Sequence, residues 1–126
     1  MPRDDALHRV RACCLALPEV VERPSHSAPT WFVQGKRSFV MLWEHGHHDH
    51  QFPHLWCAAP PGVQEELVGS EPQRFFRPPY VGGRGWIGVR LDRDVDWVEV
   101  AQICAEAYRC VAPARLVGEL DAGATP

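Results

Sequence analysis

Apolar residues recur at spacings of three and four near both ends of the chain, which predicts a helix in each region. The first helix is predicted over residues 4–17 and ends before Pro18. The second is predicted over residues 97–111, with Asp94 or Asp96 as its N-cap and Pro113 after its end. A shorter helix is predicted over residues 63–68, so three helices are expected in all.

Short apolar runs between these helices predict strands. Two of them, residues 31–33 and 38–43, are separated by a Gly35-Lys36 turn. The other runs are residues 55–59, 74–80 and 86–91. The polar, proline-bounded segment 19–29 is predicted to be a loop. The order is therefore α-β(3)-α-β(2)-α. Without regular β-α-β alternation, it predicts an α+β fold in which helices pack on an antiparallel sheet of about five strands.

The chain of 126 residues has room for one domain, which we expect over residues 1–116 with a loose C-terminal tail over residues 117–126. The core is predicted from the apolar side of each element. Its members are Leu7, Val10, Phe39, Leu42, Ile87, Val89, Val100, Cys104 and Tyr108.

Composition places the chain among ordinary globular proteins, with 45% hydrophobic and 23% charged residues. The formal net charge of −3 argues against a protein that depends on many phosphate contacts. The five cysteines include no Cys-x-x-Cys pair, and neither a secretory signal nor an apolar run of about 20 residues occurs. We therefore expect a cytoplasmic protein with reduced cysteines, no membrane partner and a monomeric state.

A histidine-rich loop is the most unusual local feature of the sequence. Its potential ligands are Glu44, His45, His47, His48, Asp49, His50 and His54. Imidazole and carboxylate groups bind transition metals. However, the loop has no helical His-x-x-x-His pair, and its glycine does not preorganise ligands. We therefore predict an exposed loop, no native metal site and no cofactor.

The residues that most resemble catalytic groups are Ser25-His26 and Cys13-Cys14. Adjacent residues rarely adopt the geometry of a nucleophile and its base, and no carboxylate is placed to support His26. A local hydrogen bond in a loop is the expected role of Ser25-His26, and the two cysteines are expected to be structural. The sequence therefore indicates a protein that is not an enzyme.

Four arginines and four aromatic residues alternate through residues 72–91, a stretch without any acid. Arginine and aromatic rings together suit phosphates and stacked bases. The Gly35-Lys36 turn adds two further cations. The candidate nucleic-acid or anion-binding residues are Lys36, Arg37, Arg74, Arg77 and Arg84. The alternative is that the rings belong to the core and the arginines form a solvated surface.

An ordered series of short motifs over residues 7–116 resembles the MmcQ/YjbR family. The series comprises Leu17-Pro18-Glu19-Val20, Ser25-His26, Pro29 to Phe32, Gly35-Lys36, Ala59-Pro60-Pro61-Gly62, Arg74-Phe75-Phe76, Pro79-Tyr80-Val81-Gly82, Gly85-Trp86, Val95-Asp96-Trp97 and Ala107-Tyr108-Arg109. The resemblance implies a twisted antiparallel sheet with helices, like that of type III secretion chaperones, also described as a double wing. Family members are commonly labelled DNA-binding by analogy of fold, and the family name also implies a link to antibiotic biosynthesis.

We therefore expect a non-enzymatic binding domain, with weak and non-specific nucleic-acid binding as the first hypothesis. The alternative is a binding or resistance protein whose ligand is a small aromatic or antibiotic-like molecule. The cleft for such a ligand is predicted from His26, Trp31, Tyr80 and Trp86.

Overall fold

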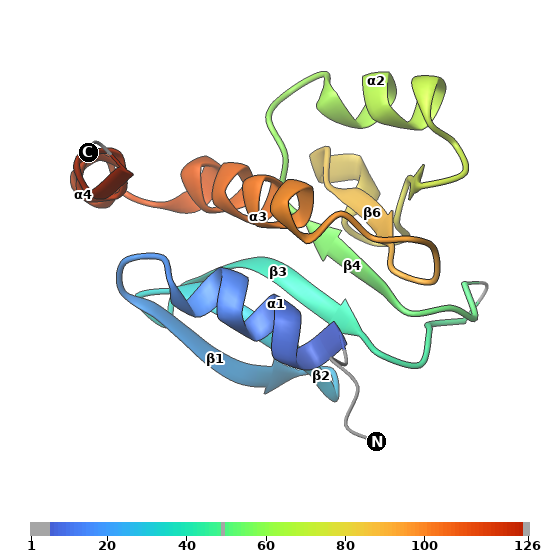
Figure 1. Cartoon of the computed structure of the whole chain (residues 1–126), viewed down its shortest axis with the longest axis horizontal. Helices are drawn as coiled ribbons and strands as arrows, with labels where there is room; N and C mark the ends of the chain where they lie inside the picture. Colours follow the sequence, from blue (N-terminus) through green and yellow to red (C-terminus); the bar gives the residue numbers. More distant parts are fainter. Residues whose placement is uncertain (1–5, 49, 125–126) are drawn as a thin grey trace.

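The protein folds as an open antiparallel sheet with α-helices, seen in a computed structural model that describes residues 6–48 and 50–124 (Figure 1). The elements are α1 (Ala6–Leu15), β1 (Val20–Ser25), β2 (Ala28–Val33), β3 (Arg37–Trp43), β4 (His54–Cys57), α2 (Val63–Ser70), β5 (Phe75–Phe76), a short 3₁₀ helix η1 (Gly82–Arg84), β6 (Ile87–Arg90), α3 (Trp97–Val111) and α4 (Ala114–Ala124). The described strands form one sheet in the order β1-β2-β3-β4-β6-β5, with every neighbouring pair antiparallel. The predicted α+β class and antiparallel sheet are confirmed.

Strand β1 replaces the loop that was predicted over residues 19–29, so the sheet has six strands in the described chain. A two-residue turn at His26 and Ser27 joins β1 to β2, and both turn residues have positive φ. This conformation matches the twist of a tight hairpin, but Asn-Gly is its usual sequence signal. Pro24 is tolerated because β1 is an edge strand.

Helix α4 corrects the prediction that the tail beyond residue 116 is loose. Pro113 ends α3 as predicted, but its carbonyl oxygen also accepts hydrogen bonds from the backbone of Leu116 and Val117 at the start of α4. Leu116 is fully buried, and Leu120, four residues on, packs against the core. This pair forms a short apolar stripe that holds the helix against the domain.

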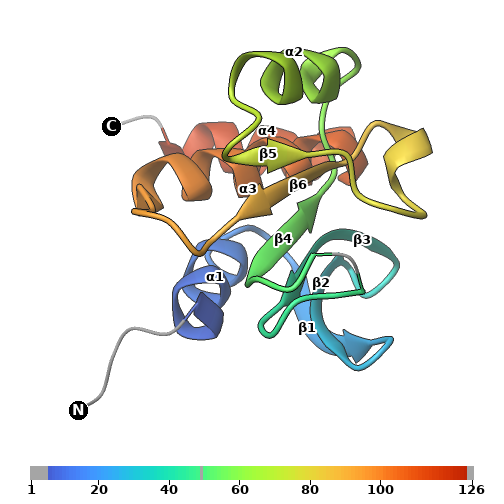
Figure 2. The ribbon, with the colours of Figure 1, turned by 90° about the vertical axis from the view of Figure 1, so that its right-hand side faces the viewer.

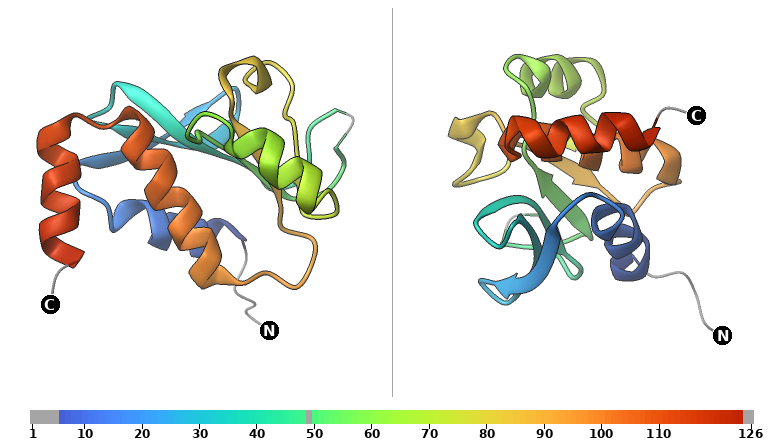
Figure 3. Two further views of the ribbon diagram at one scale, coloured as in Figure 1. Left: turned by 90° about the horizontal axis from the view of Figure 1, so that it is seen from above. Right: turned by 90° about the vertical axis from the view of Figure 1, so that its left-hand side faces the viewer.

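Helices α1 and α3 pack against each other and against the same face of the sheet (Figure 3). At the start of α3, Asp96 accepts hydrogen bonds from the backbone nitrogens of Val98 and Glu99, as expected of an N-cap. The predicted core residues are all buried except Leu7, which is half-buried and packs against the core. Strand β4, between β3 and β6, is buried along its whole length (Figure 2).

Three cysteine thiols meet inside this core, contributed by α1, β4 and α3. Cys14, Cys57 and Cys104 are buried, and burial is the main cause that holds the pKa of the Cys14 thiol well above its usual value. A thiol in this state is unreactive and packs as a small apolar side chain. The structural role that was predicted for Cys14 agrees with this placement.

No helix in residues 6–48 and 50–124 combines the length and the apolar run that crossing a membrane requires.

Candidate functional site

The sheet face opposite α1 and α3 carries a cleft formed by five chain segments. Strands β3 and β4 provide its floor, and the rest comes from the β1–β2 turn, the histidine-rich loop and the chain before η1. The lining residues are His26, Met41, Trp43, His47, His48, Trp56, Tyr80 and Val81. We call this site the aromatic cleft. Its volume is ≈ 430 Å³, which is within the range of small-molecule sites.

Two tryptophans form the floor of the aromatic cleft. Trp56 of β4 pairs with Met41 of β3, so Trp43, two residues further along β3, is a diagonal neighbour of Trp56 on the same face. The two indole rings lie 4.9 Å apart at an angle of 55°. Neither indole nitrogen has a hydrogen-bond partner among the described residues. The floor is therefore mainly apolar, and its two indole nitrogens are buried without a partner.

The histidine-rich loop folds over this floor as a tight hairpin. His47 and His50 exchange two backbone hydrogen bonds of 2.9 Å. The ring of His47 lies 4.4 Å from that of Trp43 and 5.0 Å from that of Trp56. The loop is thus held by contacts between rings, and no group of three or more potential metal ligands is found in the described chain. Asp49, one of the potential ligands named from the sequence, lies outside the described residues.

Three residues at the rim adopt the left-handed backbone conformation that favours glycine. The φ angles are 52° for His26, 45° for His48 and 63° for Tyr80. Such a conformation costs about 1–3 kcal/mol for a non-glycine residue and is concentrated at functional sites. All three belong to the aromatic cleft, and Tyr80 keeps 80% of its surface exposed. Three of the six non-glycine residues with positive φ in the described chain therefore surround one hollow.

A buried histidine lies next to the floor of the cleft. His54 is inaccessible to solvent, and its Nδ1 is 2.7 Å from the carbonyl oxygen of Phe52. Because a carbonyl oxygen only accepts, Nδ1 must carry the proton, and Nε2 is then left without a partner in the described chain. Burial is the main cause that lowers the pKa of His54 to about 4, so the ring is neutral at pH 7.

The four residues predicted to line a ligand cleft are only partly brought together. His26 and Tyr80 lie in the aromatic cleft. Trp31 is fully buried, and its indole nitrogen donates to the carboxylate of Glu22 at 3.1 Å. Trp86 lies in a different hollow, described below. Trp31 and Trp86 are therefore not part of the aromatic cleft.

The five predicted anion-binding residues are divided among several surfaces. Arg74 forms ion pairs with Glu71 and Glu99. Arg77 donates a hydrogen bond of 3.1 Å to the side-chain oxygen of Gln64, and it lines a hollow that shares His48 and Tyr80 with the aromatic cleft. The structure thus uses Arg74 and Arg77 in internal contacts of their own.

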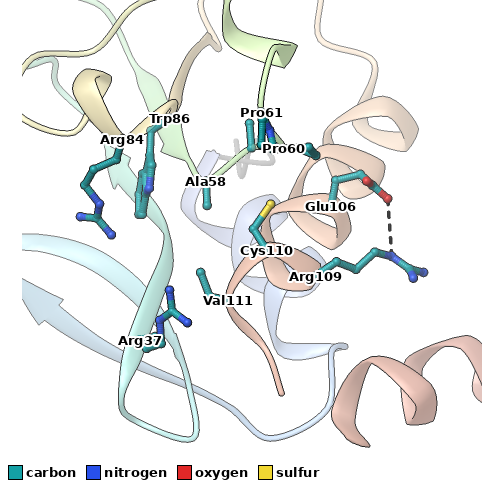
Figure 4. Close-up of a pocket in the computed structure, with 11 residues that line it drawn as sticks. Arg37, Ala58, Pro60, Pro61, Arg84, Trp86, Glu106, Arg109, Cys110 and Val111 are labelled. Carbon is teal, nitrogen blue, oxygen red and sulfur yellow. Dashed lines mark ion pairs between the residues drawn. The ribbon is translucent and has the colours of Figure 1, made fainter. Parts of the chain in front are cut away.

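The other three cations line hollows beside β3 and η1. Lys36 and Arg37 share one shallow hollow beside the start of β3. Arg37 and Arg84 share a second hollow with Trp86 and the last turn of α3 (Figure 4). The predicted set therefore contains one pair of arginines on a common concave surface.

The YjbR family model matches residues 15–110 of this chain. The chain belongs to the YjbR family. The solved structure of the Deinococcus radiodurans protein DR2400, described as a DUF419 domain, is similar in fold to this YjbR domain, with a TM-score of 0.72. The similarity covers 93% of this chain and 88% of that chain at 17% sequence identity, so it shows the shared fold alone. No curated protein matches the sequence significantly.

Ser25 and His26 of this YjbR domain make a contact, but it is a local one. Ser25 Oγ is 3.1 Å from His26 Nδ1 at the exposed end of β1. No ion pair between His26 and a carboxylate occurs in the part of the chain that the structure describes. A local hydrogen bond in a turn, as predicted, describes this contact.

Sequence reasoning missed the floor of the site. Met41 and Trp43 alternate along β3, which is the signal for a shared face. Only the position of β4 beside β3 shows that Trp56 belongs to the same surface.

Proposed function

We propose that this YjbR-family protein is a non-enzymatic binding protein for a planar aromatic small molecule held in the aromatic cleft. The observation that carries the proposal is the convergence of Trp43, Trp56 and Tyr80 on one hollow of ligand size, with strained backbone at its rim. Such sites hold ligands mainly by apolar and ring contacts, and a few polar groups orient the ligand.

The exposure of Tyr80 supports a role in gripping a ligand. Its ring centroid is 6.5 Å from Trp56 and 6.1 Å from His47, so it stands over the floor at one side. An aromatic side chain that keeps 80% of its surface in solvent gains little from the fold itself. A planar ligand between Tyr80 and the floor would bury that ring on one side.

The nucleic-acid role that the family resemblance implies has less support. A protein that binds a duplex through phosphates needs a row of free cations. Here Arg74 is neutralised by two carboxylates, and Arg77 lines a different hollow from Arg37 and Arg84. The small-molecule hypothesis therefore has the stronger geometric basis.

Titration with neutral two- and three-ring compounds such as 2-naphthol and acridone tests the proposal. Side-chain NMR of the indole N–H groups reports which tryptophans respond. The peaks of Trp43 and Trp56 should shift, whereas that of Trp31, on the opposite side of the sheet, should stay in place.

A matched pair of surface variants completes the test. Tyr80→Ala should weaken binding about two- to tenfold, the usual worth of one aromatic contact. Val98→Ala, at an exposed apolar residue of α3 outside the cleft, should leave the affinity unchanged. Equal weakening in both variants, or no response of Trp43 and Trp56, would contradict the proposal.

A further inference from the structure

A second hollow, independent of the aromatic cleft, lies where β3 begins and β4 and α3 end. Its volume is ≈ 440 Å³. The apolar part of its wall comes from Trp86, Val111 and the Ala58–Pro61 segment. Figure 4 shows Arg37 and Arg84 approaching the hollow from different elements, with Arg84 beside Trp86.

Arg37 and Arg84 differ from most arginines of the chain in having no carboxylate partner among the described residues. Both are exposed. By contrast, Arg74, Arg90 and Arg115 each form an ion pair with at least one acid. The guanidinium of Arg84 instead lies 5.0 Å from the centroid of the Trp86 ring. Two positive charges therefore face one concave surface without an internal counter-charge.

The acid that lines this hollow is already engaged. Glu106 lines the hollow, but its carboxylate is 3.5 Å from the guanidinium of Arg109. Arg109 also pairs with Asp121 at 2.6 Å. These contacts draw the third arginine and the acid into a separate network at the end of α3 and leave Arg37 and Arg84 uncompensated.

We propose that the hollow between Arg37 and Arg84 binds the phosphate monoester group of a small organic molecule. A phosphate monoester carries a charge of about −1.5 to −2 at pH 7, which matches two guanidinium groups. Guanidinium is planar and presents paired donors that fit phosphate oxygens. Trp86 and the Ala58–Pro61 segment provide an apolar wall for the organic part of the ligand.

The end of α3 opposes this binding but does not outweigh it. The C-terminus of a helix carries a partial negative charge, which weakens the binding of a neighbouring anion several-fold at most. A hydrogen bond to a charged group strengthens binding by about tenfold or more. Two arginines therefore give a net attraction, and binding is expected to be moderate and sensitive to salt.

Calorimetry with phenyl phosphate, phenyl sulfate and phenol tests the proposal on the intact chain. Phenyl phosphate should bind more tightly than the monoanionic sulfate, and phenol should show no binding at this hollow. The indole N–H peak of Trp86 should shift with phenyl phosphate, while those of Trp43 and Trp56 should not. Equal binding of phosphate and sulfate esters would overturn the proposal, because it would indicate an unselective basic surface.

Three variants assign the binding to the two arginines. Arg37→Gln combined with Arg84→Gln should weaken phenyl phosphate binding by at least about tenfold. Arg84→Lys, which keeps the charge but loses the planar fork, should weaken it less. Arg93→Gln removes one exposed arginine elsewhere and should have no effect. Unchanged binding in the double variant, or equal weakening in Arg93→Gln, would overturn the proposal.

Competition with a short DNA duplex distinguishes a site for phosphate monoesters from a site for the phosphodiesters of nucleic acid. Since phosphodiesters carry a single charge each, the duplex should not displace phenyl phosphate when both are present at equal phosphate concentration. Displacement that is lost in the double variant would overturn the proposal in favour of a nucleic-acid surface. Tyr80→Ala should leave phenyl phosphate binding intact, so this proposal and that of the aromatic cleft fail separately.

Discussion

The hydroxyl group of Tyr108 donates a hydrogen bond of 2.8 Å to the carbonyl oxygen of Pro18, a residue 90 positions earlier in the chain. Tyr108 is fully buried in α3, and its ring meets that of Phe39 edge-on at 5.7 Å. The hydrogen bond therefore fixes the segment between α1 and β1 to α3.

Removing this hydroxyl group should destabilise the domain. In Tyr108→Phe, the carbonyl oxygen of Pro18 loses its donor, and we expect the free energy of unfolding to fall by about 1–3 kcal/mol. Urea unfolding followed by circular dichroism measures the change. Tyr80→Phe removes the same group from an exposed ring and is the matched control. A similar loss in both variants would argue against a specific role for the Tyr108 bond.

Gly88 of β6 lies beneath the ring of Phe76 and leaves no room for a side chain. A Cβ atom placed there would overlap ring atoms of Phe76. Gly88→Ala should therefore lower the free energy of unfolding by about 1–3 kcal/mol through overpacking. At Gly83 the nearest neighbouring atom, Arg77 Nη2, is 4.0 Å from the same position. Gly83→Ala should accordingly be close to neutral, and thermal unfolding of the two variants checks both outcomes.

The buried, neutral His54 should make the protein less stable in mild acid. Its pKa is lowered to about 4, mainly by burial, whereas the ring titrates near 6.5 in the unfolded chain. The contribution of neutral His54 to the stability is thus fully present above pH 6.5. It is lost as the pH falls from there toward 4, because the unfolded state takes up the proton first. The total loss is about 3 kcal/mol.

Chemical denaturation at a series of pH values between 7 and 4 measures this effect. His54→Phe keeps an aromatic ring in the cluster and should flatten the profile above pH 4.5. Glu22 and Asp92 have lowered pKa values through hydrogen bonds to Arg11 and Arg90, and their contribution is lost only in the more acidic range. An unchanged profile in His54→Phe would assign the pH dependence to other groups.

We predict that the histidine-rich loop holds no metal ion in native stoichiometry. The ring of His47 is packed against Trp43 and Trp56, and ring contacts of this kind compete with metal ligation. Native mass spectrometry of untagged protein, purified without a nickel column, is the measurement. One tightly held zinc per chain that disappears in His47→Ala combined with His48→Ala would show the opposite.

Periodicity was sufficient for α3 and for the central strands, because their apolar residues are numerous and regularly spaced. It was insufficient for β1, where Glu22, Arg23 and Pro24 interrupt the apolar pattern because the strand lies at the edge of the sheet and remains partly in water. It was also insufficient for α4, which depends on Leu116 and Leu120 alone. Weak local patterns of this kind become elements only through tertiary contacts.

The candidate site was harder to predict than the fold because it is assembled across strands. Tyr80 and His26 were anticipated as cleft residues, but their partners Trp43 and Trp56 are brought to them by the β3–β4 pairing. For the arginines, the sequence suggested one common surface that the structure does not form. An acid-free stretch of sequence does not make a free basic surface, since Arg74 finds Glu99 on α3.

The three thiols enclosed by α1, β4 and α3 are built-in probes of transient opening of the domain. Cys14, Cys57 and Cys104 can be alkylated only when helices and sheet separate, whereas Cys110 is exposed in the native state. Burial raises the pKa of the Cys110 thiol, so its alkylation gives a reference rate for the native state, and the slower capture of Cys14, Cys57 and Cys104 counts opening events of the domain. The opening rate of the core can thus be measured without any introduced label.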